Sequence, residues 1–194
     1  MLMMCGMLDE TLLSGDPDIN IIIKEIPEFS KCFGLTQNHY HFGDVAEHSL
    51  AVLHHHCEMF EPNLAERLAC LLHDIGKIRT RTVKDGKIHF YNHEYAGEKM
   101  SRKILERLGY NSDIIDDVAF LIRNHMRTKQ AGENGEMMKD KTLKKILRDC
   151  GDDVEKFKSL MRVIECDNLS HAADHNIIGQ YSGLVERAIN IIKN

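Results

Sequence analysis

Apolar residues recur every third or fourth position through most of the chain, most clearly from about residue 44 onward, whereas the alternation typical of strands is nearly absent. This spacing predicts an all-α fold. Asp, Ser and Asn residues at the starts, and Gly76, Gly109 and Gly151 at the stops, set the expected helix ends. We expect helices over residues 16–25, 44–60, 63–74, 94–108, 112–127, 141–150, 152–168 and 176–192.

Two segments interrupt the helical pattern. Residues 78–91 contain R-T-R-T-V, then Asp85-Gly86, then K-I-H-F-Y, which is the turn chemistry of a small hairpin. Residues 128–140 are polar and carry two glycines, so we expect a surface loop there. Because no internal repeat is visible, we expect one domain over residues 1–194, with a helical extension at 1–25, a core at 26–175 and a final helix at 176–194.

Composition narrows the class of protein. Lys and Arg number 25 against 30 Asp and Glu, a net charge of −5, so a generally basic nucleic-acid surface is not expected. The six cysteines form no C-x-x-C pair, which favours a reducing, cytoplasmic location. The apolar start lacks a basic leader, and no apolar run approaches the roughly 20 residues that span a bilayer, so we expect no membrane partner. Twelve histidines suggest metal binding.

Several predicted helices carry possible metal ligands on or beside their apolar faces. A single stripe of the helix at 44–60 contains Val45, His48, Val52, His55 and Met59. The apolar face of the helix at 152–168 runs into Asp167, and a buried carboxylate costs several kcal/mol unless it meets a cation. The stripes of two other helices lead to the pair His73-Asp74 and to His125.

Two imidazoles and two carboxylates form a mixed set of nitrogen and oxygen ligands: His48, His73, Asp74 and Asp167. Such a set suits Mn, Fe, Co, Ni, Zn or Mg and does not resemble a structural zinc site built from thiolates. His93 and His125 could complete a second ion, with Asp74 as the bridging carboxylate. Such ions activate water and neutralise phosphoryl oxygens, so water can attack phosphorus without a protein nucleophile. We therefore expect one or two divalent ions.

The order His48, His73-Asp74 and Asp167, with C-L-L-H-D-I-G-K at residues 70–77, resembles the HD-domain superfamily of metal-dependent phosphohydrolases. Residues 29–50, N-H-E-Y-A-G at 92–97 and R-N-H-M at 123–126 are similar to the HD domain of bacterial tRNA nucleotidyltransferases and poly(A)-polymerase-like proteins. The likeness covers about residues 26–171. It implies an α-helical bundle that cleaves phosphomonoesters, cyclic phosphodiesters or nucleotides, and it implies the same metal ligands, with His93 and His125 for a second ion.

The chain also departs from these relatives. Its first forty residues cannot contain a nucleotidyltransferase domain, so we expect a stand-alone hydrolase that does not add CCA. No G-Y-P element follows the HD pair, and the Glu-Asp pair of alarmone hydrolases is not found where expected, so cyclic-di-GMP and alarmones are disfavoured as substrates.

Residues around the HD pair are candidates for catalysis and substrate binding. We expect Asp74 to orient the attacking water or take its proton, and Lys77 to hold the phosphate; the alternative for Lys77 is a solvated charge at a helix end. Arg79 and Arg81 occupy alternate positions of the predicted hairpin, hence one face, where they either bind phosphates or only aid solubility.

Four further histidines lie close to the candidate ligands in the sequence. His55, one heptad after His48, is expected either to line the pocket or to orient a metal ligand by hydrogen bonding to it, and His171, one turn after Asp167, is expected to orient a ligand in the same way. His54 and His56 are expected to be exposed.

The sequence thus predicts a metal-dependent phosphohydrolase that cleaves a phosphomonoester or phosphodiester with metal-activated water. The substrate would be a small-molecule phosphoester such as a nucleotide, or the end of an RNA. The alternatives are a non-catalytic metal- or nucleotide-binding signalling module, and histidines that merely fill the core. A homodimer stays open.

Overall fold

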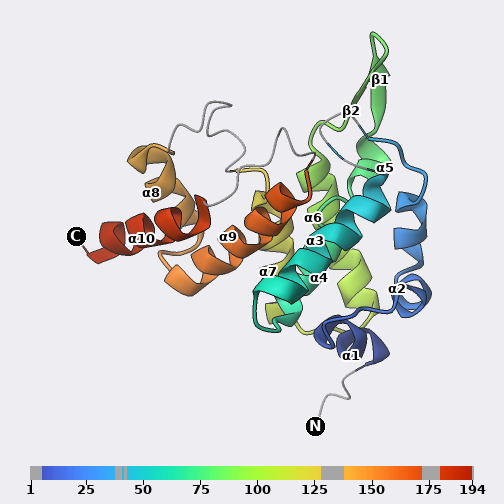
Figure 1. The fold of residues 1–194 in the computed structure, drawn as a ribbon, viewed down its shortest axis with the longest axis horizontal. Helices are drawn as coiled ribbons and strands as arrows, with labels where there is room; N and C mark the ends of the chain where they lie inside the picture. Colours follow the sequence, from blue (N-terminus) through green and yellow to red (C-terminus); the bar gives the residue numbers. More distant parts are fainter. Residues whose placement is uncertain (1–5, 38–40, 42, 128–137, 172–179, 194) are drawn as a thin grey trace.

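A computed structural model of the protein describes residues 6–37, 41, 43–127, 138–171 and 180–193, with residues 180–182 described by their backbone alone (Figure 1). These residues form ten α-helices, one 3-10 helix and one two-stranded sheet, which confirms the all-α prediction. The helices are α1 Met7–Leu13, α2 Ile19–Glu25, α3 Val45–Met59, α4 Leu64–Leu72, α5 Lys77–Thr80, α6 His93–Arg107, α7 Ser112–Asn124, α8 Asp140–Asp149, α9 Val154–Leu169 and α10 Gln180–Lys193; the 3-10 helix η1 is Pro27–Cys32.

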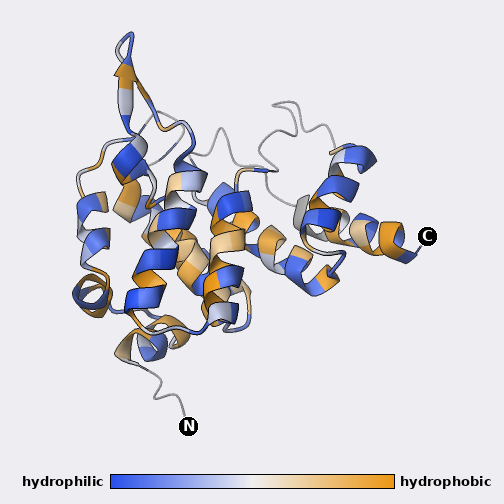
Figure 2. Cartoon of the chain, turned by 180° about the vertical axis from the view of Figure 1, so that it is seen from behind, coloured by the Kyte–Doolittle hydropathy of each residue, from blue (hydrophilic) through white to orange (hydrophobic). Residues whose placement is uncertain are grey.

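The centre of the molecule is a helical bundle. Helix α3 packs against α4 and α9, α4 also packs against α7, and α7 packs against α6. The helices carry separate hydrophilic and hydrophobic stripes (Figure 2), and the apolar stripes bury residues such as Val52, Leu71, Val118 and Leu160 completely. Helices α8 and α10 pack together at the end of the molecule away from the hairpin (Figure 1).

The N-terminal region contains more regular structure than the sequence pattern predicted. Helix α1 lies within the helical extension expected at 1–25, although no separate helix was expected before residue 16, and its Leu8 and Leu12, one turn apart, are buried in the core. The helix expected over residues 16–25 begins only at Ile19, because the Asp18 side chain caps it by accepting a hydrogen bond of 2.8 Å from the Asn20 backbone N–H. Pro27 then starts η1, which the pattern also missed.

Side-chain caps position the helices of the bundle. At the start of α3, Asp44 accepts a hydrogen bond from the Glu47 backbone, and Glu47 accepts one from the Asp44 backbone, which is a complete capping box. Asn63 caps α4 as predicted. The caps of α7 and α9 are Asn111 and Asp153, one residue away from the expected starts.

The sequence suggested that Gly76 ends a helix, but Gly76 does not adopt the left-handed backbone of such a stop. Gly109 and Gly151 do adopt positive φ angles of 81° and 74°, whereas Gly76 is right-handed with φ −64°. Hydrogen bonds from Ile75 N–H to the Leu72 carbonyl and from Lys77 N–H to the Asp74 carbonyl carry the chain in a tight turn from α4 into α5. Gly76 is needed there because a Cβ would overlap the backbone carbonyl of His93.

The predicted hairpin is present, as β1 Thr82–Lys84 and β2 Lys87–His89, and it projects from one end of the bundle (Figure 1). Its turn places Asp85 at φ 52° and Gly86 at φ 72°, as a two-residue type I′ turn requires. The predicted common face of Arg79 and Arg81 is wrong: Arg79 lies in α5 and Arg81 precedes β1, so strand alternation does not relate them.

Some predictions fall outside the described residues: most of the loop at 128–140, and positions 176–179 of the last helix. The cysteines that the structure describes are all free. No helix in the described ranges is both long enough and apolar enough to cross a membrane.

Candidate metal centre

The bundle brings six predicted ligands together from widely separated parts of the chain. All have side chains that are at most 9% exposed. They are His48 of α3, His73 and Asp74 of the turn after α4, His93 at the first position of α6, His125 directly after α7, and Asp167 in the last turn of α9. We call these six residues the His–Asp centre.

One half of the His–Asp centre joins α3, α9 and the turn after α4. The Asp167 Oδ1 atom lies 3.1 Å from His48 Nε2 and 3.8 Å from His73 Nε2. The Asp74 Oδ2 atom lies 3.2 Å from His73 Nε2 and 3.7 Å from His48 Nε2. Two carboxylate oxygens therefore face the same two imidazoles.

The other half uses the second oxygen of Asp74. Its Oδ1 atom lies 3.2 Å from His93 Nε2 and 3.9 Å from His125 Nε2. The two imidazole Nε2 atoms are themselves 3.3 Å apart. The two oxygens of one carboxylate thus face different pairs of histidines, which is the arrangement of a carboxylate that can bridge two ions.

Backbone carbonyls determine which nitrogen of three imidazoles carries the proton. Because a carbonyl oxygen can only accept a hydrogen bond, the neutral ring must hold its proton on Nδ1 and direct the Nε2 lone pair into the centre. The Nδ1 atoms of His73, His93 and His125 donate to the carbonyls of Cys70 at 2.9 Å, Phe90 at 2.9 Å and Ile122 at 2.7 Å.

The interior of the centre is therefore rich in electron-pair donors that face one another. His73 Nε2 is buried with no hydrogen-bond donor in the described structure. The lone pairs of His93 and His125 face each other at 3.3 Å beside an Asp74 oxygen. Such a cluster is unfavourable without a cation, and imidazole and carboxylate donors are those that divalent transition metals accept. The residues present fit a divalent metal site.

Electrostatics place most of these groups in the protonation states that ligation requires. Burial lowers the pKa of His125 well below its usual range, and His73 and His93 lower it further. Burial also lowers the pKa of His48, more than the bonded Asp167 raises it. Burial alone would raise the pKa of Asp74, but Lys77 and His73 hold it well below its usual range.

His73 is the exception. Burial lowers its pKa, but the charge and hydrogen bond of Asp74, the charge of Asp167 and the hydrogen bond to the Cys70 carbonyl together outweigh burial, so the pKa of His73 is raised. Ligation would require His73 to release that proton, since a metal binds the deprotonated nitrogen.

Lys77 is buried inside the site and is not the solvated helix-end charge considered as its alternative. Its ammonium lies 2.6 Å from Asp74 Oδ2 and 2.6 Å from the amide oxygen of Gln37, and its side chain is 4% exposed. The ring of Phe90 lies beneath it, 5.3 Å away. Gln37 was not identified from the sequence because it lies in a non-helical segment where periodicity carries no information.

Two further histidines border the centre. His41, His48 and His171 offer nitrogen atoms that all lie within 4.8 Å of one another. His171 Nε2 is also 3.7 Å from Asp167 Oδ1, which agrees with its predicted place beside a ligand. His41 was not singled out, and an isolated bridge pairs its backbone with that of His171.

The sequence assigned His55 and His56 to the wrong faces of α3. The structure does not bring His55 to the centre: its side chain is 32% exposed and lies 3.9 Å from Glu58. His56 is completely buried, 2.7 Å from Glu66. The heptad spacing misleads because His48 lies at the edge of the buried face of α3. Residues seven apart differ by about 20° around a straight helix, which puts His55 just outside that face, whereas Val45, Val52 and His56 lie near its middle.

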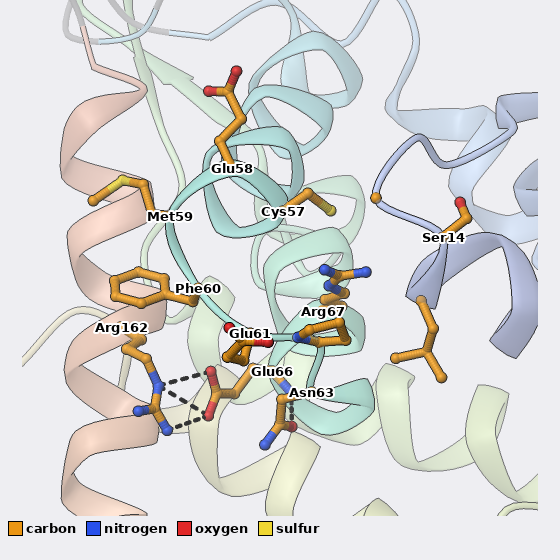
Figure 3. Close-up of a pocket in the computed structure, with 13 residues that line it drawn as sticks. Ser14, Cys57, Glu58, Met59, Phe60, Glu61, Asn63, Glu66, Arg67 and Arg162 are labelled. Carbon is orange, nitrogen blue, oxygen red and sulfur yellow. Dashed lines mark hydrogen bonds and ion pairs between the residues drawn. The ribbon is translucent and has the colours of Figure 1, made fainter.

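A cavity of about 660 Å³ lies beyond the C-terminal end of α3, lined also by α4 and by Arg162 of α9 (Figure 3). At its wall, Glu66 accepts hydrogen bonds from Arg162 Nε at 3.0 Å and Nη2 at 2.8 Å, and it bonds His56. Burial raises the pKa of Glu66, but these partners outweigh burial and lower it. None of the six residues of the His–Asp centre lines this cavity.

The family of the chain follows from comparison with known proteins. Residues 45–156 match the model of the HD domain, which is more than half of the chain. The chain therefore belongs to the HD domain family. Asp167 and His171 lie beyond the matched residues.

Relatives with modest identity share this region. The A-adding tRNA nucleotidyltransferase of Deinococcus radiodurans is 36% identical over 104 residues, 52% of this chain and 24% of that protein. The CC-adding tRNA nucleotidyltransferase of Thermus thermophilus is 34% identical over 104 residues, again 52% and 24%. The Multifunctional CCA protein of Aromatoleum aromaticum is 32% identical over 146 residues, 73% of this chain and 34% of that protein. The chain thus spans a quarter to a third of the length of these relatives.

Proposed function

We propose that this chain is a metal-dependent phosphohydrolase that cleaves a phosphomonoester or phosphodiester with water. The proposal rests mainly on the position of Asp74, whose two carboxylate oxygens face separate pairs of histidines. Hydrogen bonds to backbone carbonyls direct the Nε2 lone pairs of three of these histidines toward the Asp74 oxygens. Membership of the HD domain family supports it.

His48, His73, Asp74 and Asp167 would hold one divalent ion, and His93 and His125 would join Asp74 around a second. When bound, such ions lower the pKa of water toward neutrality and neutralise charge on phosphoryl oxygens. The carbonyls behind His73, His93 and His125 keep the rings in the tautomer that ligation needs.

Asp74 and Lys77 would act on the reacting groups. Because the pKa of Asp74 is held well below its usual range, Asp74 has little affinity for a proton and is better suited to orient water than to deprotonate it. Lys77 would contribute its ammonium to the phosphoryl oxygens. The Phe90 ring and the Gln37 amide fix the position of that ammonium.

The proposed substrates are nucleotides or the end of an RNA. The relatives reported above are named for tRNA nucleotide addition, and the matched region of this chain corresponds to only a part of each of them. Arg79 and Arg81 are exposed close to Lys77 in the chain, and would bind additional phosphates.

Turnover with a panel of substrates tests the proposal. The purified chain is supplied with Mn, Co, Ni or Mg and offered an aryl phosphodiester, an aryl phosphomonoester, 2′,3′-cyclic nucleotides and 5′-nucleotides. We expect metal-dependent release of product from at least one of them. Absence of turnover, with metal shown to be bound, would favour a metal- or nucleotide-binding signalling module instead.

A further inference from the structure

The hairpin of β1 and β2 carries unbalanced positive charge. Lys84 and Lys87 flank its turn and are exposed, and Arg81 precedes it. Asp85 is the one acidic residue between Arg81 and Tyr91. Within the described residues, no ion pair involves either lysine. We call residues 81–91 the basic arm.

The register of the hairpin gathers these charges on one face. Thr82 pairs with His89 and Lys84 pairs with Lys87. Directly paired residues of antiparallel strands point to the same side of the sheet, and residues two apart on a strand do so as well. One face of the basic arm therefore carries both lysines near its tip, with Thr82 and His89 nearer its base.

An exposed aromatic surface continues this face. The rings of His89 and Tyr91 are stacked, with centroids 5.1 Å apart and planes inclined by 10°. Tyr91 is 70% exposed, so much of its ring is left for a further planar group to stack on. A planar ring with a polar tip beside lysines suits nucleobases better than it suits an apolar protein partner.

The base of the basic arm adjoins the His–Asp centre. Phe90 lies between the two stacked residues in the chain, its carbonyl accepts the His93 Nδ1 proton at 2.9 Å, and its ring lies under the Lys77 ammonium. A chain that follows the arm from its tip toward its base is therefore led toward Lys77 and His93.

We propose that the basic arm binds a single-stranded polynucleotide, with Lys84 and Lys87 at its phosphates and a base stacked on Tyr91. The strand end would then be directed to the His–Asp centre, so this inference rests on the proposed function and specifies its substrate class. A duplex is excluded from this mode because its bases are already stacked on one another. Since the whole chain carries a net charge of −5, the attraction is local to the arm.

Fluorescence anisotropy with short labelled RNA and DNA strands tests the charge requirement. The variant Lys84→Ala/Lys87→Ala is compared with Lys144→Ala/Lys145→Ala, which removes the same charge from exposed positions of α8. We expect the arm variant to raise Kd about tenfold or more, and to flatten the slope of log Kd against log salt by about 1.4, that is roughly 0.7 for each phosphate contact. The α8 variant should bind as the wild type does.

A second pair of variants tests stacking. Tyr91→Ala should raise Kd about fivefold or more, because one base loses its stacking partner, and the loss should persist at high salt. Tyr91→Phe keeps the ring and should bind almost normally. Circular dichroism of each variant confirms that the helices are retained.

Three results would overturn the inference: strand binding that the arm variants leave unchanged, equal affinity for a duplex, or equally effective competition by polyglutamate, which would make the arm a general polyanion site. Because the assay measures binding and not turnover, it separates the two proposals. A wild type that binds strands through Lys84 and Lys87 but hydrolyses no phosphoester would support the arm and refute the hydrolase.

Discussion

The ammonium of Lys77 lies 2.6 Å from the Asp74 Oδ2 atom, and both side chains are buried, at 4% and 2% exposure. This ion pair places a fixed positive charge against the carboxylate that would bridge the metal ions. It leaves Asp167, the other buried carboxylate of the His–Asp centre, to be balanced by the groups around it. With metal bound as proposed, the balance of charge in the site would depend on both Lys77 and the ions.

Removing the Lys77 charge should make the fold more dependent on metal. In Lys77→Gln the buried Asp74 carboxylate loses its ammonium, and breaking such a pair costs about 3–5 kcal/mol of unfolding free energy. A divalent ion bound at the centre would restore positive charge at the same carboxylate. We expect Mn to raise Tm by more in Lys77→Gln than in the wild type, measured by scanning calorimetry, and kcat/KM to fall by roughly 100-fold. An equal Tm shift in both proteins would contradict this account.

Asp74→Asn should abolish turnover while the helices remain. The amide cannot supply the negative charge that either proposed ion requires, so we expect activity to fall by about 10³-fold or more, with an unchanged circular dichroism spectrum. Asp116→Asn is the matched control, because Asp116 is 64% exposed and pairs with Arg102 outside the centre. Full activity in Asp74→Asn would refute the proposed role.

Gly76→Ala should destabilise the protein and disturb the centre. The added Cβ would overlap the His93 carbonyl, and backbone cannot yield as a flexible side chain does. We expect a loss of about 1–3 kcal/mol in a urea titration, together with reduced activity because the start of α6 must move. The control is Gly183→Ala in α10, where nothing lies within 4 Å of the new Cβ and stability should rise by about 0.5–1 kcal/mol.

Glu66 should make stability depend on pH. Its pKa is lowered in the folded state, so its stabilising contribution is present above the pKa of the unfolded chain, about 4.3, and is lost as the pH falls through the folded value. Glu66→Gln should cost about 3 kcal/mol near neutral pH, and this difference from the wild type should shrink below about pH 4.

Urea titrations across the acid range measure the effect, and Glu155→Gln serves as control. Glu155 is 73% exposed and pairs with Lys158 on the same helix, so its substitution should change stability by less than about 0.5 kcal/mol at any pH. A difference in unfolding free energy between the wild type and Glu66→Gln that stays constant as the pH falls into the acid range would show that these partners do not stabilise the ionised form of Glu66.

Helical periodicity predicted the bundle because each long helix buries one stripe. It also indicated His48 and Asp167 as neighbours in a site although 119 residues separate them, because both follow apolar faces that must meet in one core. Periodicity could not identify Gln37 or His41, which lie outside helices. It misplaced His56, because the buried face of α3 turns toward Glu66, and the sequence does not show which helix supplies that partner.

The stretch from Leu72 to Arg81 shows a second limit. A glycine after a helix usually marks a left-handed stop, yet Gly76 serves the close approach of α6, a contact with a segment seventeen residues later. Tertiary packing therefore keeps the chain helical through α5, whereas the sequence pattern predicted that the hairpin begins at residue 78.

The number of ions that the protein binds is the most decisive test of the proposed His–Asp metal centre. Four proteins are compared: the wild type, His125→Ala, His55→Ala and Asp74→Asn. Each is equilibrated with Mn and separated from unbound ion, and its metal content is measured by inductively coupled plasma mass spectrometry. We expect two ions for the wild type and His55→Ala, one for His125→Ala, and none for Asp74→Asn. Equal metal content in the wild type and Asp74→Asn, or a folded wild type that binds no metal, would contradict the proposed centre.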